Sequence, residues 1–159
     1  MKKWQNFIDE VKKKHKTIAS VICVNENNEI LLIKRSKTDP SKPGYWDLPG
    51  GHVDDEDKSI ELGAIRELRE ETTLEVDEKD LIYVVKQERE GASKYIYATT
   101  IWSGSVNFVE NPKSGIVEHS DSRWVTIDQI KDDESLELRT FPAYLLDEAL
   151  EKLNNDQDS

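Results

Sequence analysis

Apolar residues recur with a helical period at both ends of the chain and near its middle. Trp4, Phe7, Ile8 and Val11 have the spacing i, i+3, i+4 and i+7, so residues 3–14 are predicted to form an amphipathic helix. Further helices are predicted over 58–72, after the capping-box sequence at 126–129, and over 141–153 with Thr140 as N-cap. The chain therefore places helices before, between and after its predicted strands.

Strand signals fill the remaining apolar stretches. Five segments are predicted to be strands: 17–25, 30–35, 81–88, 93–102 and 123–125. A polar turn at 25–28 joins the first two, and a hairpin near Gly91 joins the third and fourth. This order predicts one layered α/β domain over 15–153, preceded by the leading segment 1–14 and followed by a frayed polar tail at 154–159.

Composition narrows the class of protein. With 159 residues, 36% hydrophobic and 35% charged, the chain suits a single globular domain with an ionised surface. No apolar run has the length of a membrane span, and the start lacks the apolar stretch of a signal peptide. We expect a cytoplasmic protein without a membrane partner. Cys23 is the only cysteine, so we expect it to be a small buried strand residue.

The net charge of −11 restricts the classes of ligand that the protein can bind. An acidic surface repels a polyphosphate backbone, so stable binding to nucleic acids is not expected. An anionic small-molecule substrate would need a bridge between two negative partners. Clustered carboxylates that load metal ions would supply that bridge.

Three acids in the predicted middle helix form such a cluster. Each helical residue advances by about 100°, so Glu67, Glu70 and Glu71 share one face. A solvated charged face is the plain alternative. The Leu48-Pro49-Gly50-Gly51 segment upstream favours the cluster, because two glycines predict a sharp turn that brings backbone carbonyls close to the helix. Carboxylate and carbonyl oxygens are the ligands that Mg²⁺ or Mn²⁺ prefers.

Two other phosphate or metal motifs are absent from the sequence. The three histidines are dispersed and the single cysteine has no partner, so nothing resembles a zinc site. No Gly-Lys-Ser/Thr follows the glycine pair, so the segment is not a P-loop.

The segment resembles the Nudix box, in which Gly, five residues, Glu and seven residues precede Arg-Glu-U-x-Glu-Glu-x-Gly-U, where U is a bulky aliphatic. The matching residues are Gly51, Arg66, Glu67, Leu68, Glu70, Glu71 and Leu74. The stretches 27–32 and 123–128 also resemble the family's first hairpin and its late strand-to-helix junction. The resemblance implies a mixed β-sheet sandwiched between α-helices, with the catalytic helix on one face.

Two departures from the box stand out. One extra residue lies between Gly51 and Arg66, so the first acid of the box is either Asp57 or Glu56, and either is a candidate outer metal ligand. Thr73 replaces the glycine near the helix end. Since a left-handed conformation is unfavourable for a β-branched residue, we expect this helix to end differently.

The resemblance also implies roles. Glu70 and Glu71 would be the principal metal ligands, together with the Gly51 carbonyl. Glu67 would be a third ligand or the base that deprotonates water. Arg66 would hold the glutamates through a bidentate bond.

A further acid late in the chain contributes as base or ligand in related enzymes. Glu118 matches that position best and Asp121 is the reserve, with a plain loop carboxylate as the alternative for Glu118.

Substrate recognition is less constrained by the sequence. Lys34 and Arg35, like Arg89 and Lys94, are candidates for contacting phosphates. Aromatic candidates for stacking on a base are Tyr97, Tyr95 and Trp102, although packing within the core is the favoured interpretation for any one of them.

The implied function is metal-dependent cleavage of a diphosphate linkage in a nucleoside triphosphate or nucleoside diphosphate derivative, by water attack on phosphorus. No proline lies between Pro49 and Pro112, which disfavours the pattern of ADP-ribose hydrolases. The alternatives are an RNA 5′-end pyrophosphohydrolase, which the acidic chain disfavours, and a nucleotide sensor without catalysis. The leading helix would either cap the sheet or make a dimer contact. The sequence therefore allows both a monomer and a homodimer.

Overall fold

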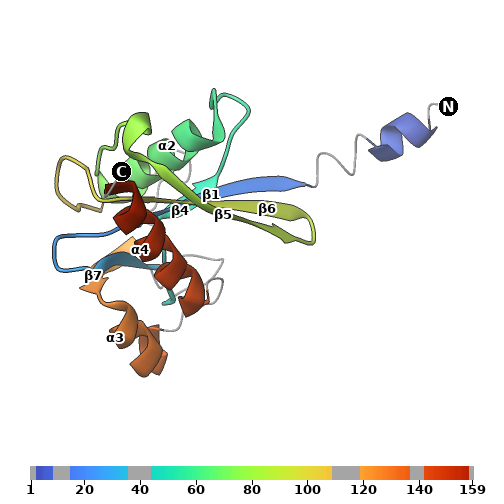
Figure 1. Cartoon of the computed structure of the whole chain (residues 1–159). Helices are drawn as coiled ribbons and strands as arrows, with labels where there is room; N and C mark the ends of the chain where they lie inside the picture. Colours follow the sequence, from blue (N-terminus) through green and yellow to red (C-terminus); the bar gives the residue numbers. More distant parts are fainter. Residues whose placement is uncertain (1–2, 9–14, 36–43, 109–118, 137–141, 158–159) are drawn as a thin grey trace.

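Two β-sheets and the helices that cover them make up the fold (Figure 1). The computed structural model describes residues 3–8, 15–35, 44–108, 119–136 and 142–157. The strands are β1 (Lys16–Cys23), β2 (Ile30–Arg35), β3 (Trp46–Asp47), β4 (Gly50–His52), β5 (Ile82–Arg89), β6 (Ala92–Thr99) and β7 (His119–Val125). The helices are residues 3–8, α2 (Ile60–Thr72), α3 (Ile127–Asp132) and α4 (Ala143–Gln157), with short 3-10 turns at Glu78–Asp80 and Glu134–Leu136.

The larger sheet is mixed and has the order β4-β1-β6-β5. Strands β1 and β6 run parallel, whereas β1–β4 and β5–β6 are antiparallel. The smaller sheet, β3-β2-β7, is antiparallel throughout. The predicted mixed sheet between helices is therefore confirmed, with the refinement that the strands divide into two sheets.

Side-chain alternation in β1 separates two cores. Ala19, Val21 and Cys23 pack with the buried face of α2, whereas Ile22 packs with the apolar face of α4. The helices α2 and α4 accordingly cover opposite faces of the larger sheet (Figure 1). Cys23 is fully buried as predicted, and burial raises the pKa of its thiol to about 12.

Several local predictions are confirmed. Strand β2 has the expected bounds, Gly91 takes a positive φ of 75° at the hairpin, and Thr126 forms the predicted capping box with Gln129. None of the helices in the described ranges combines the length and apolar character that crossing a membrane would require.

The two ends of the chain differ from expectation. Helix α4 continues to Gln157, so the prediction of a frayed tail from Asn154 was wrong over that stretch. Leu153 is 2% exposed and anchors the last turns, and once a helix is nucleated each added residue gains a hydrogen bond. Residues 3–8 are helical, while the rest of the predicted leading helix and Thr140 lie outside the described residues.

Candidate functional site

Helix α2 begins at a side chain that caps its first turn. The Ser59 hydroxyl accepts a hydrogen bond from the Leu62 N–H at 3.1 Å, which caps the first turn. Buried Ala64, Ile65 and Leu68 fix one side of the helix against the sheet. The acids that lie between these apolar positions are thereby held beside β4.

Arg66 is the centre of the polar contacts on this helix. Its Nε and Nη2 donate to the two carboxylate oxygens of Asp57 at 2.9 and 3.0 Å. Its Nη1 lies 3.1 Å from an oxygen of Glu67 and 3.1 Å from an oxygen of Glu70, and Nη2 also donates to the His52 carbonyl at 2.9 Å. The bidentate partner of the guanidinium is therefore Asp57, and each glutamate receives a single bond.

Four carboxylates surround this one guanidinium, since Asp54 also lies 3.4 Å from Arg66. Burial raises the pKa of Glu67 to about 6; Arg66 opposes the rise and the neighbouring Glu70 adds to it. The pKa of Arg66 is itself raised, first by its hydrogen bond to Asp57. The cluster keeps an excess of negative charge that a cation would offset.

The paired glycines are needed for close approach rather than for a turn. Both lie in β4, and neither has a positive φ. A Cβ on Gly51 would lie 2.6 Å from the carboxyl carbon of Glu67, and one on Gly50 would lie 2.4 Å from the Ala19 carbonyl oxygen. The Gly50 N–H donates to Glu71 at 2.9 Å. The predicted sharp turn was wrong, because strand pairing with β1 keeps this backbone extended.

Asp57, which is the first acid of the box by count from Gly51, lies in contact with Arg66. Asp57 has a side chain that is 9% exposed, and its oxygens accept from Arg66 and from the Asp54 N–H. A Cβ on Gly63 would lie 3.0 Å from Asp57, so a glycine there leaves room for the carboxylate. Of the two candidates for the first acid, Asp57 pairs with Arg66 and Glu56 is exposed in the preceding turn.

Thr73 ends α2 in the left-handed conformation, with φ 66° and ψ 7°, so the expectation of a different ending was wrong. Its N–H donates to the Arg69 carbonyl, as a glycine in that position would. Its hydroxyl donates to the Ser105 carbonyl at 2.6 Å, a contact that offsets the strain. Gly104 contributes space, because a Cβ there would lie 3.2 Å from the Thr73 carbonyl oxygen.

Three of the other predicted residues lie in the smaller sheet, on β2 and β7. Lys34 and Arg35 are half-buried on β2, with the Lys34 ammonium 5.8 Å from the centre of the Trp46 ring. Asp121 is exposed on β7 and lies opposite Lys34 in the register of β2 and β7. Glu118 lies outside the described residues.

Tyr97 packs in the core, as the sequence favoured for an aromatic residue in a strand. It is 2% exposed, and its hydroxyl donates to Glu61 on α2 at 3.0 Å. Burial, followed by this bond, raises the pKa of its phenol. A ring in this position supports the helix and offers no open face to a base.

Asp54 and Gly63 belong to the site but were not predicted. Both serve Arg66, one as an ion-pair partner and one by leaving space for Asp57. The signal available was the acidic run before the helix, in which Asp54 stands three residues ahead of Asp57. Because the box has one extra residue, counting along the sequence does not identify which of these acids contacts Arg66.

The donors suit a hard cation. Within the described ranges, no group of three or more His, Cys, Asp or Glu side chains forms a ready-made metal cage. Mg²⁺ does not require one, because it keeps several waters and takes one or two carboxylates together with substrate oxygens. Glu67 and Glu70 already share one nitrogen of Arg66, and Glu71 lies on the same helix beside Gly50.

Comparison with known proteins decides the family. The family model of the NUDIX domain matches residues 14–147. The chain belongs to the Nudix family. The solved structure of a MutT protein from Methanosarcina mazei Go1 is similar, with 27% identity and a TM-score of 0.62 over 89% of this chain and 95% of that chain. The Nudix assignment from the sequence is thus confirmed.

Two curated relatives show how far the similarity extends. The "ADPR responsive transcriptional repressor NtrR" of Acinetobacter baylyi is 33% identical over 132 residues, which cover 80% of this chain and 48% of the relative. A "Putative 8-oxo-dGTP diphosphatase" of Bacillus subtilis is 48% identical over 54 residues, which cover 34% of this chain and 32% of the relative. The Nudix chain studied here therefore matches less than half the length of each of these relatives.

Proposed function

We propose that this Nudix protein is a divalent-metal-dependent hydrolase. It cleaves a diphosphate linkage in a nucleoside triphosphate or nucleoside diphosphate derivative, by attack of water on phosphorus. The observation that carries the proposal is the ratio of four carboxylates to one guanidinium around Arg66, next to a glycine pair that permits close approach.

The carboxylates of α2 would hold the metal. Glu70 and Glu71 are its proposed principal ligands, with Glu67 and the Gly51 carbonyl beside them. When bound, Mg²⁺ or Mn²⁺ lowers the pKa of water and neutralises phosphate charge. Excess negative charge in the apo site favours loading of such a cation, because like charges at close range disfavour one another.

Arg66 acts as a positioning residue in this proposal. Its Nε, Nη1 and Nη2 atoms are all engaged by protein oxygens, so the side chain orients acids rather than reaching a substrate. The contacts to Asp57 and to the His52 carbonyl tie the guanidinium to the loop before α2. The glutamates are thereby held against the helix before any ligand enters.

Glu67 is the proposed proton acceptor or third ligand. Its carboxylate lies against Gly51 and is only 16% exposed. A partly buried carboxylate beside the metal position is placed to accept a proton from the attacking water. Glu118 keeps its role as the alternative base.

The substrate class is tested by a panel. We would follow loss of substrate and formation of the phosphate-bearing products by chromatography for dGTP, 8-oxo-dGTP, ADP-ribose and a capped RNA, each with Mg²⁺, with Mn²⁺ and with EDTA. Turnover of one or more small nucleotides that EDTA abolishes is expected. Turnover that persists in EDTA, or none on any substrate with either metal, would contradict the proposal.

A second candidate is a nucleotide sensor, and one observation favours it. The relative whose match covers 80% of this chain is a repressor described as responsive to ADPR. Calorimetric titration of ADP-ribose into the protein with Mg²⁺ separates the two candidates. Tight binding without any turnover in the panel favours the sensor, whereas turnover assigns the chain to the hydrolases.

A further inference from the structure

The leading helix leaves its apolar side uncovered. Trp4, Phe7 and Ile8 lie at i, i+3 and i+4, and their exposed fractions are 68, 55 and 39%. The rings of Trp4 and Phe7 lie 5.7 Å apart, so they form one patch. A contiguous exposed apolar patch of this kind marks a surface that another surface covers.

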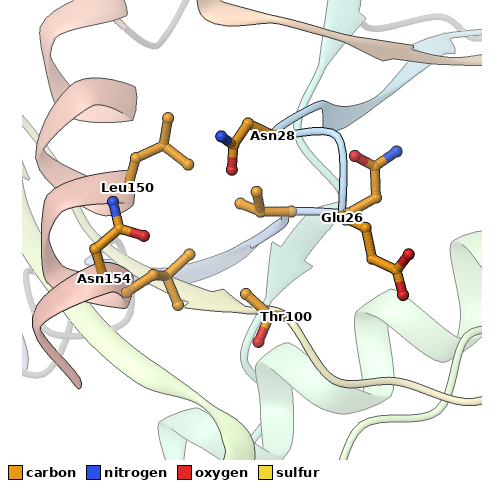
Figure 2. A pocket seen from close by; sticks show the side chains of 8 residues that line it. Glu26, Asn28, Thr100, Leu150 and Asn154 are labelled. Atoms are coloured by element: carbon orange, nitrogen blue, oxygen red, sulfur yellow. The ribbon is translucent and has the colours of Figure 1, made fainter. Parts of the chain in front are cut away.

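A groove lies at the turn between β1 and β2. It consists of two adjoining hollows of about 390 and 480 Å³, which share Asn25, Glu26 and Thr100. Figure 2 shows the first hollow, where Asn28 of the turn lies opposite Leu150 and Asn154 of α4 across an open space, while the side chain of Glu26 points away from that helix. We call the two hollows together the turn groove.

The lining of the turn groove suits apolar and basic groups. Val24, Leu150 and Leu153 contribute apolar surface to the first hollow. Trp102 and Ile101 line the second, and Ile101 is 58% exposed. Among the described residues that line the two hollows, Glu26 is the only charged one, and none belongs to the carboxylate cluster around Arg66.

The leading helix and the turn groove lie at opposite ends of β1. The leading segment enters at Lys16, whose N–H donates to the Gly91 carbonyl at the β5–β6 hairpin, whereas Val24 follows the last residue of the strand. Eight residues of strand span about 26 Å. In a two-fold dimer each copy would offer one leading helix and one turn groove to its partner.

Charge complements this arrangement. Residues 1–16 hold six lysines and two acids, whereas the remaining residues hold 16 Lys or Arg and 31 Asp or Glu. The leading segment is therefore basic and the body of the domain strongly acidic. Opposite charges steer a basic helix toward an acidic surface of another molecule, whereas two basic helices repel each other.

We propose that the leading helix of one copy docks its Trp4, Phe7 and Ile8 into the turn groove of a second copy, in a reciprocal homodimer. The aromatic rings enter the two hollows, and the positive charge of the leading segment favours its approach to the acidic domain of the second copy. The partner is a second copy of this chain because the groove and the helix complement each other in apolar character and in charge.

Mass measurement on the full chain tests the dimer. Sedimentation equilibrium over a dilution series is expected to give twice the mass of the chain, with weaker association at high salt. The double substitution Trp4→Ser, Phe7→Ser on the helix and the single substitution Ile101→Lys in the groove should each give a monomer. Tyr144→Ser, which removes an aromatic that is 65% exposed near the start of α4, should leave the dimer intact.

Cross-linking tests which surfaces meet. In a Cys23→Ala background, Phe7→Cys and Ile101→Cys are placed in separate, differently tagged chains, mixed and oxidised. A disulfide between the two chains is expected, and Tyr144→Cys in place of Ile101→Cys should give none. A monomer at every concentration overturns the proposal, as does a dimer that Ile101→Lys leaves unchanged.

Discussion

Helices α2 and α4 are similar in length and both carry acidic residues, but they use these acids differently. In α4, Asp147 pairs with Lys131 at 3.0 Å and Glu148 pairs with Lys152 at 3.6 Å. All four side chains are at least 37% exposed. Exposed one-to-one pairs of this kind contribute little to stability, and each pair is neutral.

The acids around α2 share one basic partner and are less exposed than the acids of α4. Asp54, Asp57, Glu67 and Glu70 share Arg66, and none of the five side chains is more than 31% exposed. Glutamates at helical spacing occur in both helices, so their presence does not identify an ion site. The number of acids per cation and their burial make that distinction.

The largest expected effect is a loss of activity when an acid of α2, but not an acid of α4, is replaced. Glu70→Gln and Glu71→Gln should each lower kcat/KM by about 100- to 1000-fold, the range found when one electrostatic stabiliser is removed. Glu148→Gln on α4 should retain the native rate. Steady-state assays on the best substrate of the panel, with circular dichroism to confirm folding, would measure this. Equal losses in all three variants would remove the distinction between the helices.

Core truncation separates stability from positioning. Leu68 on α2 and Leu146 on α4 are both fully buried, so Leu68→Ala and Leu146→Ala should each lose about 2–5 kcal/mol of unfolding free energy. Only Leu68→Ala should also slow the folded enzyme, because a shift of about 1 Å in a reacting group can reduce the rate 100-fold. Urea titration and assays well below the midpoint would check both statements. A rate loss in Leu146→Ala as large as in Leu68→Ala would contradict the second.

The raised pKa of Glu67 predicts a pH-dependent difference in metal-free protein. Its folded-state pKa of about 6 exceeds the ordinary value of 4.5, so its stabilising contribution is present below pH 4.5 and is lost as the pH rises through 6. Glu67→Gln cannot ionise and should become more stable than the native protein by about 1–2 kcal/mol at pH 7.

Thermal unfolding in EDTA between pH 4.5 and 7.5 measures this effect. The difference in Tm between Glu67→Gln and the native protein should grow with pH, whereas Glu148→Gln controls for the loss of a helix charge. A difference that stays constant over this range would show that Glu67 ionises with an ordinary pKa.

Local patterns predicted local structure well. Strand signals in the apolar stretch 30–35 predicted β2 with its observed bounds, and the capping box at Thr126 was recognisable from four adjacent residues. The shared face of Glu67 and Glu70 followed from helix geometry alone, and both glutamates contact Arg66. Interactions within one helical turn are fixed by spacing, and spacing is visible in a sequence.

Interactions between distant segments were harder to predict. The parallel pairing of β1 with β6 joins strands that lie far apart in the chain, and no local pattern encodes it. Arg66 was expected to hold the glutamates through a bidentate bond, but its bidentate partner is Asp57, which lies nine positions earlier in the chain. The glycine pair was assigned to a turn because its steric neighbours, Glu67 and Ala19, come from two other elements.

Thr73 gives the smallest expected effect and tests why a β-branched residue is tolerated at the end of α2. Thr73→Gly relieves about 1–2 kcal/mol of left-handed strain but loses a hydrogen bond worth about 0.5–1.5 kcal/mol, so stability should change by less than about 1 kcal/mol. Thr73→Val keeps the strain and loses the bond to the Ser105 carbonyl, so it should be the less stable variant by about 1 kcal/mol. Urea unfolding of both variants decides the point. If Thr73→Val matches the native protein, the hydroxyl does not offset the strain, and the helix end must be held instead by the backbone bonds that follow it, such as those between Glu75 and Ser103.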